Sequence, residues 1–241
     1  MRHLHTSASR VIAIFALLAP SLAHAEDLGN GITYDTANGY YSVVANLAAV
    51  GTEVRVACEM IRAVKEGRAH VINLSLCCQT HDDLPPIAIA AALDVIGEWE
   101  RDHGRKVVIV AAAGNYGDAR PCWPAAFGRV VSVAALAPDL LPAPWSSHGF
   151  WVTCSTIGHG LLSTYVAGRE SPLLVPTPFD FGPDAWATWS GTSFAAPQIT
   201  GALARLYEEY AYSFREALRV LLDAGQPVPG YGRALKILPG A

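Results

Sequence analysis

The sequence predicts a three-layer α/β domain, in which helices cover both faces of a mostly parallel β-sheet. From residue 45 onward, segments with helical spacing of apolar residues alternate with short apolar runs. These runs are apolar almost throughout, as in strands that are buried on both faces. Of 241 residues, 51% are apolar and 16% are charged, which suits one domain with a buried core.

The first half of this pattern contains two helices and the strand between them. Residues 45–67 space their apolar side chains as a helix does, and the glycine at position 67 is a natural stop. Residues 69–76 (AHVINLSL) follow as a short, β-branched strand. Residues 85–104 are expected to form a helix, since two prolines stand at the start and a glycine at the end.

Two further strands and a long helix complete the pattern. Residues 106–115 (KVVIVAAAGN) and 129–136 (RVVSVAAL) have the pattern of buried strands, and the Pro-rich segment 171–184 is interpreted as a loop, not a domain boundary. The last helix starts within WSGTSFAAPQITGALARL (189–206). Its apolar residues follow one another at steps of four, three and four positions, which predicts that they share one face of the helix. That face consists of Ile199, Leu203, Leu206 and Tyr210.

The N-terminal residues have the three parts of a secretory signal peptide. A basic start is followed by the apolar run VIAIFALLAPSLA and by AHA at 23–25, with cleavage expected before Glu26. Residues 26–241 are then the folded domain, and the protein is secreted or periplasmic. The alternative is that residues 1–25 contribute a buried helix of the fold, and the protein is then cytoplasmic. The apolar run is too short for a membrane span in either case.

Charge and cysteine spacing exclude several kinds of partner. The formal net charge is −4 and no basic block occurs, so neither nucleic acid nor an anionic membrane surface is expected to bind. The five cysteines match no zinc spacing, and no metal or cofactor is expected. In an exported chain, one or two disulfides are expected, joining Cys77 or Cys78 to Cys122 or Cys154. In a cytosolic chain, these side chains would be small buried hydrophobes.

Polar residues stand where three elements meet the carboxyl edge of the predicted sheet. Ser75 ends one strand, Asn115 ends the next, and Ser193 opens the last helix. Active sites of parallel sheets gather at this edge. Backbone N–H groups at a helix start and an Asn amide can together stabilise the oxyanion that forms when a serine attacks a carbonyl. Taken singly, the same residues are an ordinary strand hydroxyl, a turn residue and a helix cap, so the prediction depends on their joint order.

Three motifs in this order resemble the subtilisin-like serine peptidases: VINLSL, AAAGN, and SGTSFAAP before a helix. The resemblance extends through CWPAAFGRVVSVAAL, WSSHGFWVTCSTIGHGLLST and GYGRALKI, and so covers roughly residues 45–238. It implies the subtilisin-like fold and a serine endopeptidase that acts on polypeptides. The chemistry that it implies needs no metal, although relatives often bind structural calcium.

The resemblance also assigns roles to the matching residues. Ser193 is the expected nucleophile, and Asn115 donates to the oxyanion together with the backbone N–H of Ser193. The resemblance further implies an edge strand that pairs with an extended substrate, and a pocket wall that contacts the substrate residue before the scissile bond. They are formed by Ser75, Leu76 and Cys77 on the edge and by Ala113 and Gly114 on the wall. The family usually has glycine where Cys77 stands, so this side chain is expected to narrow the cleft or tie it down by a disulfide.

A catalytic Asp and His should precede VINLSL, and neither motif is recognised. No strand ending in Asp-x-Gly is expected, and Asp27 and Asp35 are interpreted as loop residues. LHTSASRVIAI loosely resembles the family's His-Gly-Thr-x-Val-Ala run, which would make His5 the base and the apolar stretch after it a buried helix. That interpretation and a cleaved signal peptide exclude each other. The other histidines considered are expected to be surface or packing residues: His70, His103, His148 and His159.

Two explanations account for the incomplete motifs. In the first, the chain is the C-terminal portion of a subtilase catalytic domain, N-terminally incomplete. In the second, it is a catalytically impaired pseudo-peptidase that binds extended peptides without cutting them. A third class, an α/β serine hydrolase acting on small esters, is disfavoured because its nucleophile motif G-x-S-x-G would need glycine where Ala195 stands.

Overall fold

The computed structural model describes the backbone of residues 11–14, 25–27, 32–35, 40–43, 53–165, 167–169 and 177–238, and side chains from residue 53 onward within these ranges. Among these residues the main element is a ten-stranded sheet, which runs parallel from β14 to β4 and has antiparallel strands at both edges. Its spatial order is β13 (Gln226–Val228), β14 (Gly232–Ala234), β8 (Cys154–Ile157), β7 (Val130–Leu136), β6 (Val108–Ala112), β5 (Val71–Leu74), β1 (Val11–Ile14), β4 (Tyr40–Val43), β3 (Ile32–Asp35) and β2 (Ala25–Asp27). The predicted α/β class with a mostly parallel sheet is confirmed.

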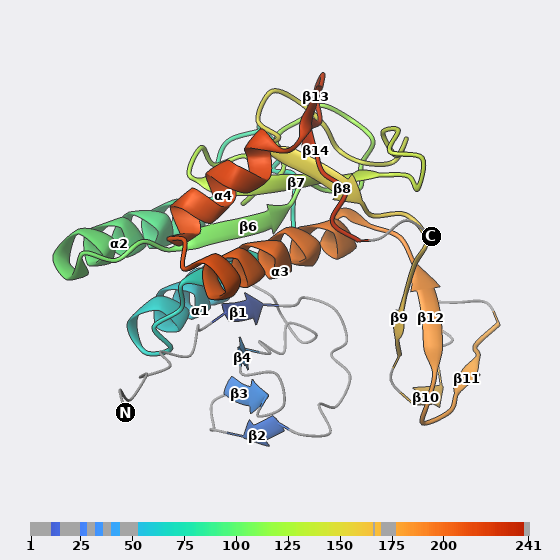
Figure 1. The fold of residues 1–241 in the computed structure, drawn as a ribbon, viewed down its shortest axis with the longest axis horizontal. Helices are drawn as coiled ribbons and strands as arrows, with labels where there is room; N and C mark the ends of the chain where they lie inside the picture. Colours follow the sequence, from blue (N-terminus) through green and yellow to red (C-terminus); the bar gives the residue numbers. More distant parts are fainter. Residues whose placement is uncertain are drawn as a thin grey trace.

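Helices pack on both faces of this sheet and form the outer layers (Figure 1). They are α1 (Glu53–Lys65) and α2 (Ile87–His103) on one face, and α3 (Thr192–Tyr210) and α4 (Phe214–Asp223) on the other. Neighbouring residues of β6 point to opposite faces, so Ile109 belongs to the core under α1 and α2 and Val110 to the core under α3 and α4. Burial on both faces is why the predicted strands are apolar throughout.

The predicted helices and strands are present, and their bounds differ from the predicted ones mainly at the ends. Helix α2 begins after Pro86 and is closed by Gly104, whose φ of 62° is the left-handed conformation that glycine adopts most easily. Helix α1 begins at Glu53, and residues 45–52 of the predicted helix lie outside the described part of the chain. Among the described residues, no helix is both long and apolar enough to cross a bilayer.

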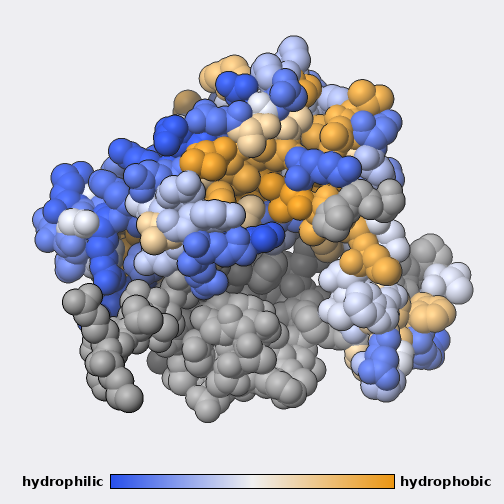
Figure 2. Space-filling model, in the orientation of Figure 1, coloured by the Kyte–Doolittle hydropathy of each residue, from blue (hydrophilic) through white to orange (hydrophobic). Residues whose placement is uncertain are grey.

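Helix α3 has the predicted apolar face over most of its length. Ile199 and Leu203 are fully buried, and Leu206 packs beside them. Tyr210 is 59% exposed, so its assignment to this face is wrong. It is the last residue of the helix and its ring stacks on Tyr212 instead of on the sheet. Figure 2 shows apolar residues gathered between α3 and α4 on the outer side of this layer.

An arm of short antiparallel strands projects from the body between β8 and α3 (Figure 1). It pairs β9 (Leu161–Thr164) with β12 (Trp186–Trp189), and β10 (Gly168–Arg169) with β11 (Asp180–Phe181). Because β11 lies within the Pro-rich segment 171–184, the loop prediction is wrong for those two residues. Residues 171–176 of the segment lie outside the described residues.

The N-terminal strands correct two expectations. Val11–Ile14 is strand β1, which pairs with β5, so the buried-helix alternative is wrong at these four residues. Asp27 and Asp35 are the last residues of β2 and β3, not loop residues, and Asp27 is followed by Leu28 and Gly29, so a strand ending in Asp-x-Gly does occur. Strand β2 stands at the far edge of the sheet, with β3, β4 and β1 between it and β5. The signal-peptide boundary remains a prediction.

Candidate active site

Ser193 and Asn115 face one common space at the carboxyl edge of the sheet. Asn115 follows β6, and Ser193 is the second residue of α3. A Cβ added to Gly191 would lie 3.0 Å from the Oγ of Ser193 and 3.5 Å from the Nδ2 of Asn115. The Oγ of Ser193 and the Nδ2 of Asn115 are therefore no farther apart than the sum of these two distances. A reacting carbonyl group has to sit about 3 Å from both the nucleophile and its oxyanion donors, and this space meets that requirement.

The carboxamide of Asn115 is oriented by Thr192, the first residue of α3. Its Oδ1 accepts the Thr192 N–H at 2.9 Å and the Thr192 hydroxyl at 3.0 Å. A backbone N–H can only donate, so the side-chain atom that faces it must be the oxygen. The Thr192 hydroxyl in turn accepts the Gly114 N–H at 3.0 Å and is fully buried. This chain of bonds leaves the Nδ2 of Asn115 as the atom directed to the common space.

The backbone N–H of Ser193 is the second open donor at this point. The N-cap residue of α3 is Gly191, so the Ser193 hydroxyl does not act as the helix cap. At the helix start, the Thr192 N–H binds Asn115 and the Phe194 N–H binds the Gly191 carbonyl at 3.0 Å. Among the described residues, the Ser193 N–H has no acceptor, as is usual for the first turn of a helix. Two donors are thus available to one anion.

A buried network fixes the backbone of Ser193 to the end of β5. Pro197 stands four residues after Ser193 and has no N–H, so the Ser193 carbonyl lacks its helical donor. The Ser75 hydroxyl donates to that carbonyl at 2.9 Å and itself accepts the Asn73 Nδ2 at 2.8 Å. The Thr200 hydroxyl donates to the Asn73 Oδ1 at 3.1 Å, and thereby connects this network back to α3.

The proposed substrate edge and pocket wall lie beside these residues. Residues 75–77 follow β5 and belong to no strand among the described residues, whereas Cys78 pairs with Trp123 through bonds of 2.9 and 2.8 Å. Ala113 and Gly114 are buried. Gly114 has a φ of 109°, and a Cβ there would lie 2.6 Å from the Sγ of Cys122, so glycine is required. The side chain of Leu76 packs against the core under α1 and α2.

Sequence reasoning missed three residues of this arrangement. Thr192 orients Asn115, Asn73 holds Ser75, and Gly191 keeps the reacting space open. Thr192 and Gly191 were visible as members of the SGTSFAAP motif, but nothing local to the motif indicates their contacts. The side chain of Ser75, expected at a substrate edge, is buried and bonded to the protein.

No histidine or carboxylate among the described residues is hydrogen-bonded to the Ser193 hydroxyl, and His5, the predicted base, lies outside them. Four of the described histidines lie against other aromatic rings, as expected of packing residues. They are His70 on Tyr207 and Phe214, His103 on Trp99, His148 on Tyr231 and His159 beside Trp145. In the described ranges, no three His, Cys, Asp or Glu side chains gather as a set of metal ligands.

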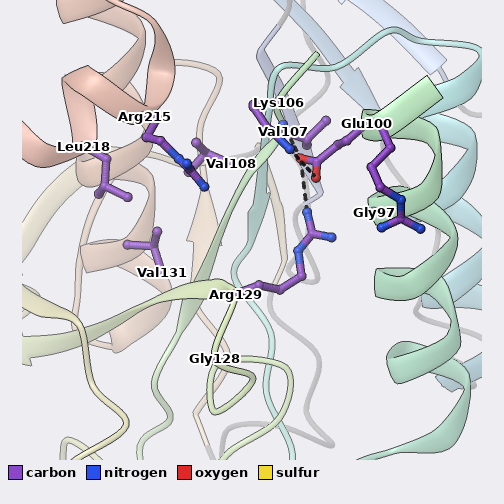
Figure 3. A pocket seen from close by; sticks show the side chains of 11 residues that line it. Gly97, Glu100, Lys106, Val107, Val108, Gly128, Arg129, Val131, Arg215 and Leu218 are labelled. Atoms are coloured by element: carbon purple, nitrogen blue, oxygen red, sulfur yellow. Dashed lines mark hydrogen bonds and ion pairs between the residues drawn. The ribbon is translucent and has the colours of Figure 1, made fainter. Parts of the chain in front are cut away.

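A pocket of about 640 Å³ lies at the opposite end of the sheet and contains no candidate site residue (Figure 3). It is lined by basic side chains from α2, α4 and the amino ends of β6 and β7. Glu100 is buried there and accepts the Val107 N–H at 2.7 Å, with Arg129 at 3.3 Å and Lys106 at 3.8 Å. Its carboxylate holds three elements together, which is a structural role.

Comparison of the sequence with protein families matches the subtilase family over residues 18–224. A thermophilic serine proteinase of Bacillus sp. (strain AK1) is 32% identical over 186 residues, covering 77% of this chain and 39% of that protein. An extracellular basic protease of Dichelobacter nodosus is 35% identical over 98 residues, covering 40% of this chain and 15% of that protein. The chain therefore spans less than half the length of these curated relatives.

Solved structures show the same fold. The patellamide maturation protease PatA has a TM-score of 0.70 at 20% identity, covering 95% of this chain and 94% of that chain. Proteases from Pseudoalteromonas arctica PAMC 21717 have a TM-score of 0.62 at 23% identity, covering 78% of this chain and 57% of that chain. At these identities the likeness concerns the arrangement of the sheet and helices.

Proposed function

The chain belongs to the subtilase family, and we propose on that premise that it is a serine endopeptidase whose nucleophile is Ser193. The observation that carries this proposal is the space beside Gly191, which the Oγ of Ser193 and the Nδ2 of Asn115 approach to 3.0 and 3.5 Å. A family of peptidases implies a polypeptide substrate.

In this mechanism the Ser193 Oγ attacks the carbonyl carbon of the scissile bond. The carbonyl oxygen becomes an oxyanion and accepts hydrogen bonds from the Asn115 Nδ2 and the Ser193 N–H. Thr192 holds the Asn115 carboxamide through two bonds of 2.9 and 3.0 Å before any substrate arrives. Donors fixed in this way need little reorganisation as the anion forms. Such preorganised stabilisation of the developing charge is usually the largest single contribution to the rate enhancement. Collapse of the tetrahedral intermediate expels the amine and leaves the acyl-enzyme, which water then hydrolyses.

The substrate is proposed to lie along residues 75–77 as an added strand. These residues follow a buried strand and precede Cys78, which is already paired with Trp123. The side chain before the scissile bond would then point toward Ala113 and Gly114, both of which are buried. Main-chain hydrogen bonds of this kind give affinity without demanding a particular sequence.

A fluorophosphonate probe tests the nucleophile. Wild-type protein is expected to be labelled at Ser193, and Ser193→Ala is expected to abolish labelling. Asn115→Ala should slow it by roughly 10²- to 10³-fold, the loss known for a single oxyanion donor in a subtilisin. Ser190→Ala is the matched control, because that hydroxyl, three residues away, accepts the Gly160 N–H at 2.9 Å and lies outside the reaction. Absence of wild-type labelling, together with binding of an extended peptide that is not cut, would establish the pseudo-peptidase instead.

The proton acceptor and the cellular location are tested together. The hydroxyl proton must pass to a base, which in this family is a histidine oriented by an aspartate. If residues 1–25 are a leader, the protein is secreted or periplasmic and cleavage removes His5; the name of the Dichelobacter relative calls that protein extracellular. N-terminal sequencing of the exported protein should then begin at Glu26. A mature chain that starts at Met1 and loses labelling in His5→Ala would instead support His5 as the base.

A further inference from the structure

The pocket of about 640 Å³ at the amino edge of the sheet gathers positive charge that is dispersed along the sequence. Its charged lining residues are four cations and one carboxylate, namely Arg101, Lys106, Arg129, Arg215 and Glu100. Glu100 balances one positive charge, which leaves three in excess. The whole chain has a formal net charge of −4, so this excess is created by folding and does not follow from the composition.

Two of the four cations are held in place by Glu100. Its carboxylate lies 3.3 Å from the Nη2 of Arg129 and 3.8 Å from the Nζ of Lys106. The Nη1 of Arg129 also donates to the Leu93 carbonyl at 2.9 Å. Figure 3 shows these charged side chains meeting on the α2 side of the pocket. Because Glu100 is buried, both cations are fixed from within the protein.

The other two cations are Arg101 on α2 and Arg215 on α4. Among the described residues, neither has an ion pair with a carboxylate. The carboxylate next to Arg215 in the chain, that of Glu216, accepts the N–H and the hydroxyl of Ser213 in the capping box. Figure 3 shows Arg215 reaching into the pocket from α4, across from Arg129. The pocket therefore has cations on two sides, and part of their charge is left for a ligand.

Gly97 lets two guanidinium groups lie close together on the α2 side. A Cβ added at this position would lie 3.3 Å from the Nη1 of Arg129 and 3.8 Å from the Nη1 of Arg101. Both groups thus come within 4 Å of one point, although like charges at such a separation repel each other. A bound anion would offset this repulsion.

We propose that this pocket binds a small molecule that carries a di- or triphosphate group, either a free polyphosphate or a nucleotide. Guanidinium groups form paired hydrogen bonds with phosphate oxygens, which favours phosphate wherever several arginines converge. A cleft lined by charges of one sign also raises the local concentration of ligands of the opposite sign.

Charge and size both favour a ligand with more than one phosphate. A single phosphate carries at most about two negative charges near neutral pH, fewer than the three positive charges in excess. Cations on two sides of the pocket need an anion that extends between them. The volume of about 640 Å³ lies within the range of small-molecule sites. The inference does not rest on the proposed function, because the candidate catalytic residues stand at the opposite edge of the sheet.

Isothermal titration calorimetry with sodium tripolyphosphate in metal-free buffer tests the site. Tripolyphosphate should bind at least about 10-fold more tightly than orthophosphate, because it carries more charge. Arg101→Gln and Arg215→Gln should each weaken its binding by roughly 10-fold or more, since each removes charge-assisted hydrogen bonds. Arg219→Gln is the matched control on α4, because that guanidinium pairs with Asp223 at 3.3 Å and does not line the pocket. Equal affinity for orthophosphate, an equal loss in Arg219→Gln, or no binding would overturn the proposal.

Thermal unfolding distinguishes a ligand site from a structural role of the arginines. Without a ligand, Arg215→Gln should keep or raise the Tm, because it removes a like charge, and a Tm lower by more than about 5 °C would overturn the proposal. Tripolyphosphate at about 100 times its Kd should raise the wild-type Tm by roughly 5–10 °C, and the same concentration should raise that of Arg215→Gln less.

Titration with ATP in the same metal-free buffer distinguishes the two sources of the phosphate group. Binding tighter than that of tripolyphosphate assigns the pocket to a nucleotide, and equal or weaker binding assigns it to the phosphate chain alone. Either result supports the proposal, provided that Arg101→Gln and Arg215→Gln weaken it. ATP binding that both variants leave unchanged would place the nucleotide elsewhere and overturn it.

Discussion

Substituting Gly191 by alanine is expected to remove activity and to leave the fold intact. The added methyl group would stand 3.0 Å from the Oγ of Ser193 and 3.5 Å from the Nδ2 of Asn115, where the proposed mechanism places the carbonyl group of the substrate. The φ of Gly191 is 162°, an extended conformation that alanine adopts without strain. A Tm measured on the same samples separates the loss of this space from any loss of stability at the helix start.

The magnitude follows from what the methyl group displaces. A carbonyl that cannot enter this space loses both oxyanion donors and its approach to the nucleophile. Removal of one donor from a subtilisin costs roughly 10²- to 10³-fold in kcat, so the loss here should be about 10³-fold or more. Because Gly191 is buried and the added methyl group also lies 3.5 Å from the Cδ2 of Phe194, crowding should lower the free energy of unfolding by about 1–3 kcal/mol.

The assay is the rate of fluorophosphonate labelling at Ser193, with the Tm measured on the same samples. Gly201→Ala is the matched control on α3, since a Cβ at Gly201 meets nothing within 4 Å. It should label at the wild-type rate and gain roughly 0.5–1 kcal/mol of stability from the lower entropy of the unfolded chain. A Gly191→Ala protein that labels as fast as the wild type would refute the assignment of this space to the reacting carbonyl.

Three further predictions address the scaffold and the thiols. Ser75→Ala leaves the Nδ2 of the buried Asn73 and the Ser193 carbonyl without a partner, so urea unfolding should show a loss of about 1–3 kcal/mol, and an unchanged midpoint would contradict the network. Glu100→Ala removes the acceptor of the Val107 N–H and should cost about 1–3 kcal/mol, whereas Glu100→Gln, which keeps an acceptor, should cost less. Alkylation of Cys77, whose titratable neighbours are Cys122, Cys78 and Tyr116, should reach half its maximal rate below about pH 8.5, because its lowered pKa populates the thiolate earlier. Cys122→Ala should shift that midpoint upward by removing the S–H donor, and identical pH profiles would refute this cause.

The central strands could be predicted from the sequence because burial on both faces makes them apolar throughout. Strand β8 (CSTI) lacked that signal, although all four residues are buried. The Thr156 hydroxyl lies 3.4 Å from the Oε1 of Gln198 on α3, a contact that no local pattern indicates. Helix α4 did have a local signal, the capping box between Ser213 and Glu216, and sequence reasoning overlooked it.

In the candidate site, sequence reasoning named the residues that are proposed to act on the substrate and missed those that position them. Ser193 and Asn115 stand in recognisable motifs. Thr192 and Asn73 act through partners that lie far away in the chain, Asn115 and Thr200. Such pairings exist only once the strands have been placed side by side, so periodicity and propensity contain no information about them.

The motif SGTSFAAP itself can now be explained residue by residue. Gly191 has no side chain to fill the space beside Ser193 and Asn115. The Thr192 hydroxyl accepts the Gly114 N–H and donates to the Asn115 carboxamide. Ala195 and Ala196 are fully buried, and their small side chains let the start of α3 lie close to the sheet.

Pro197 completes this explanation through the group that it lacks. Without an N–H, it cannot bond the carbonyl of Ser193, which is left for the Ser75 hydroxyl at 2.9 Å. The backbone of Ser193 is thereby fixed to the end of β5 as well as to its own helix. Pro197→Ala would restore the helical donor and set it in competition with Ser75. If positioning by β5 matters, this variant should fold normally, label Ser193 more slowly, and become insensitive to Ser75→Ala. Additive effects of the two substitutions on labelling would show that the contact with Ser75 has no part in positioning Ser193.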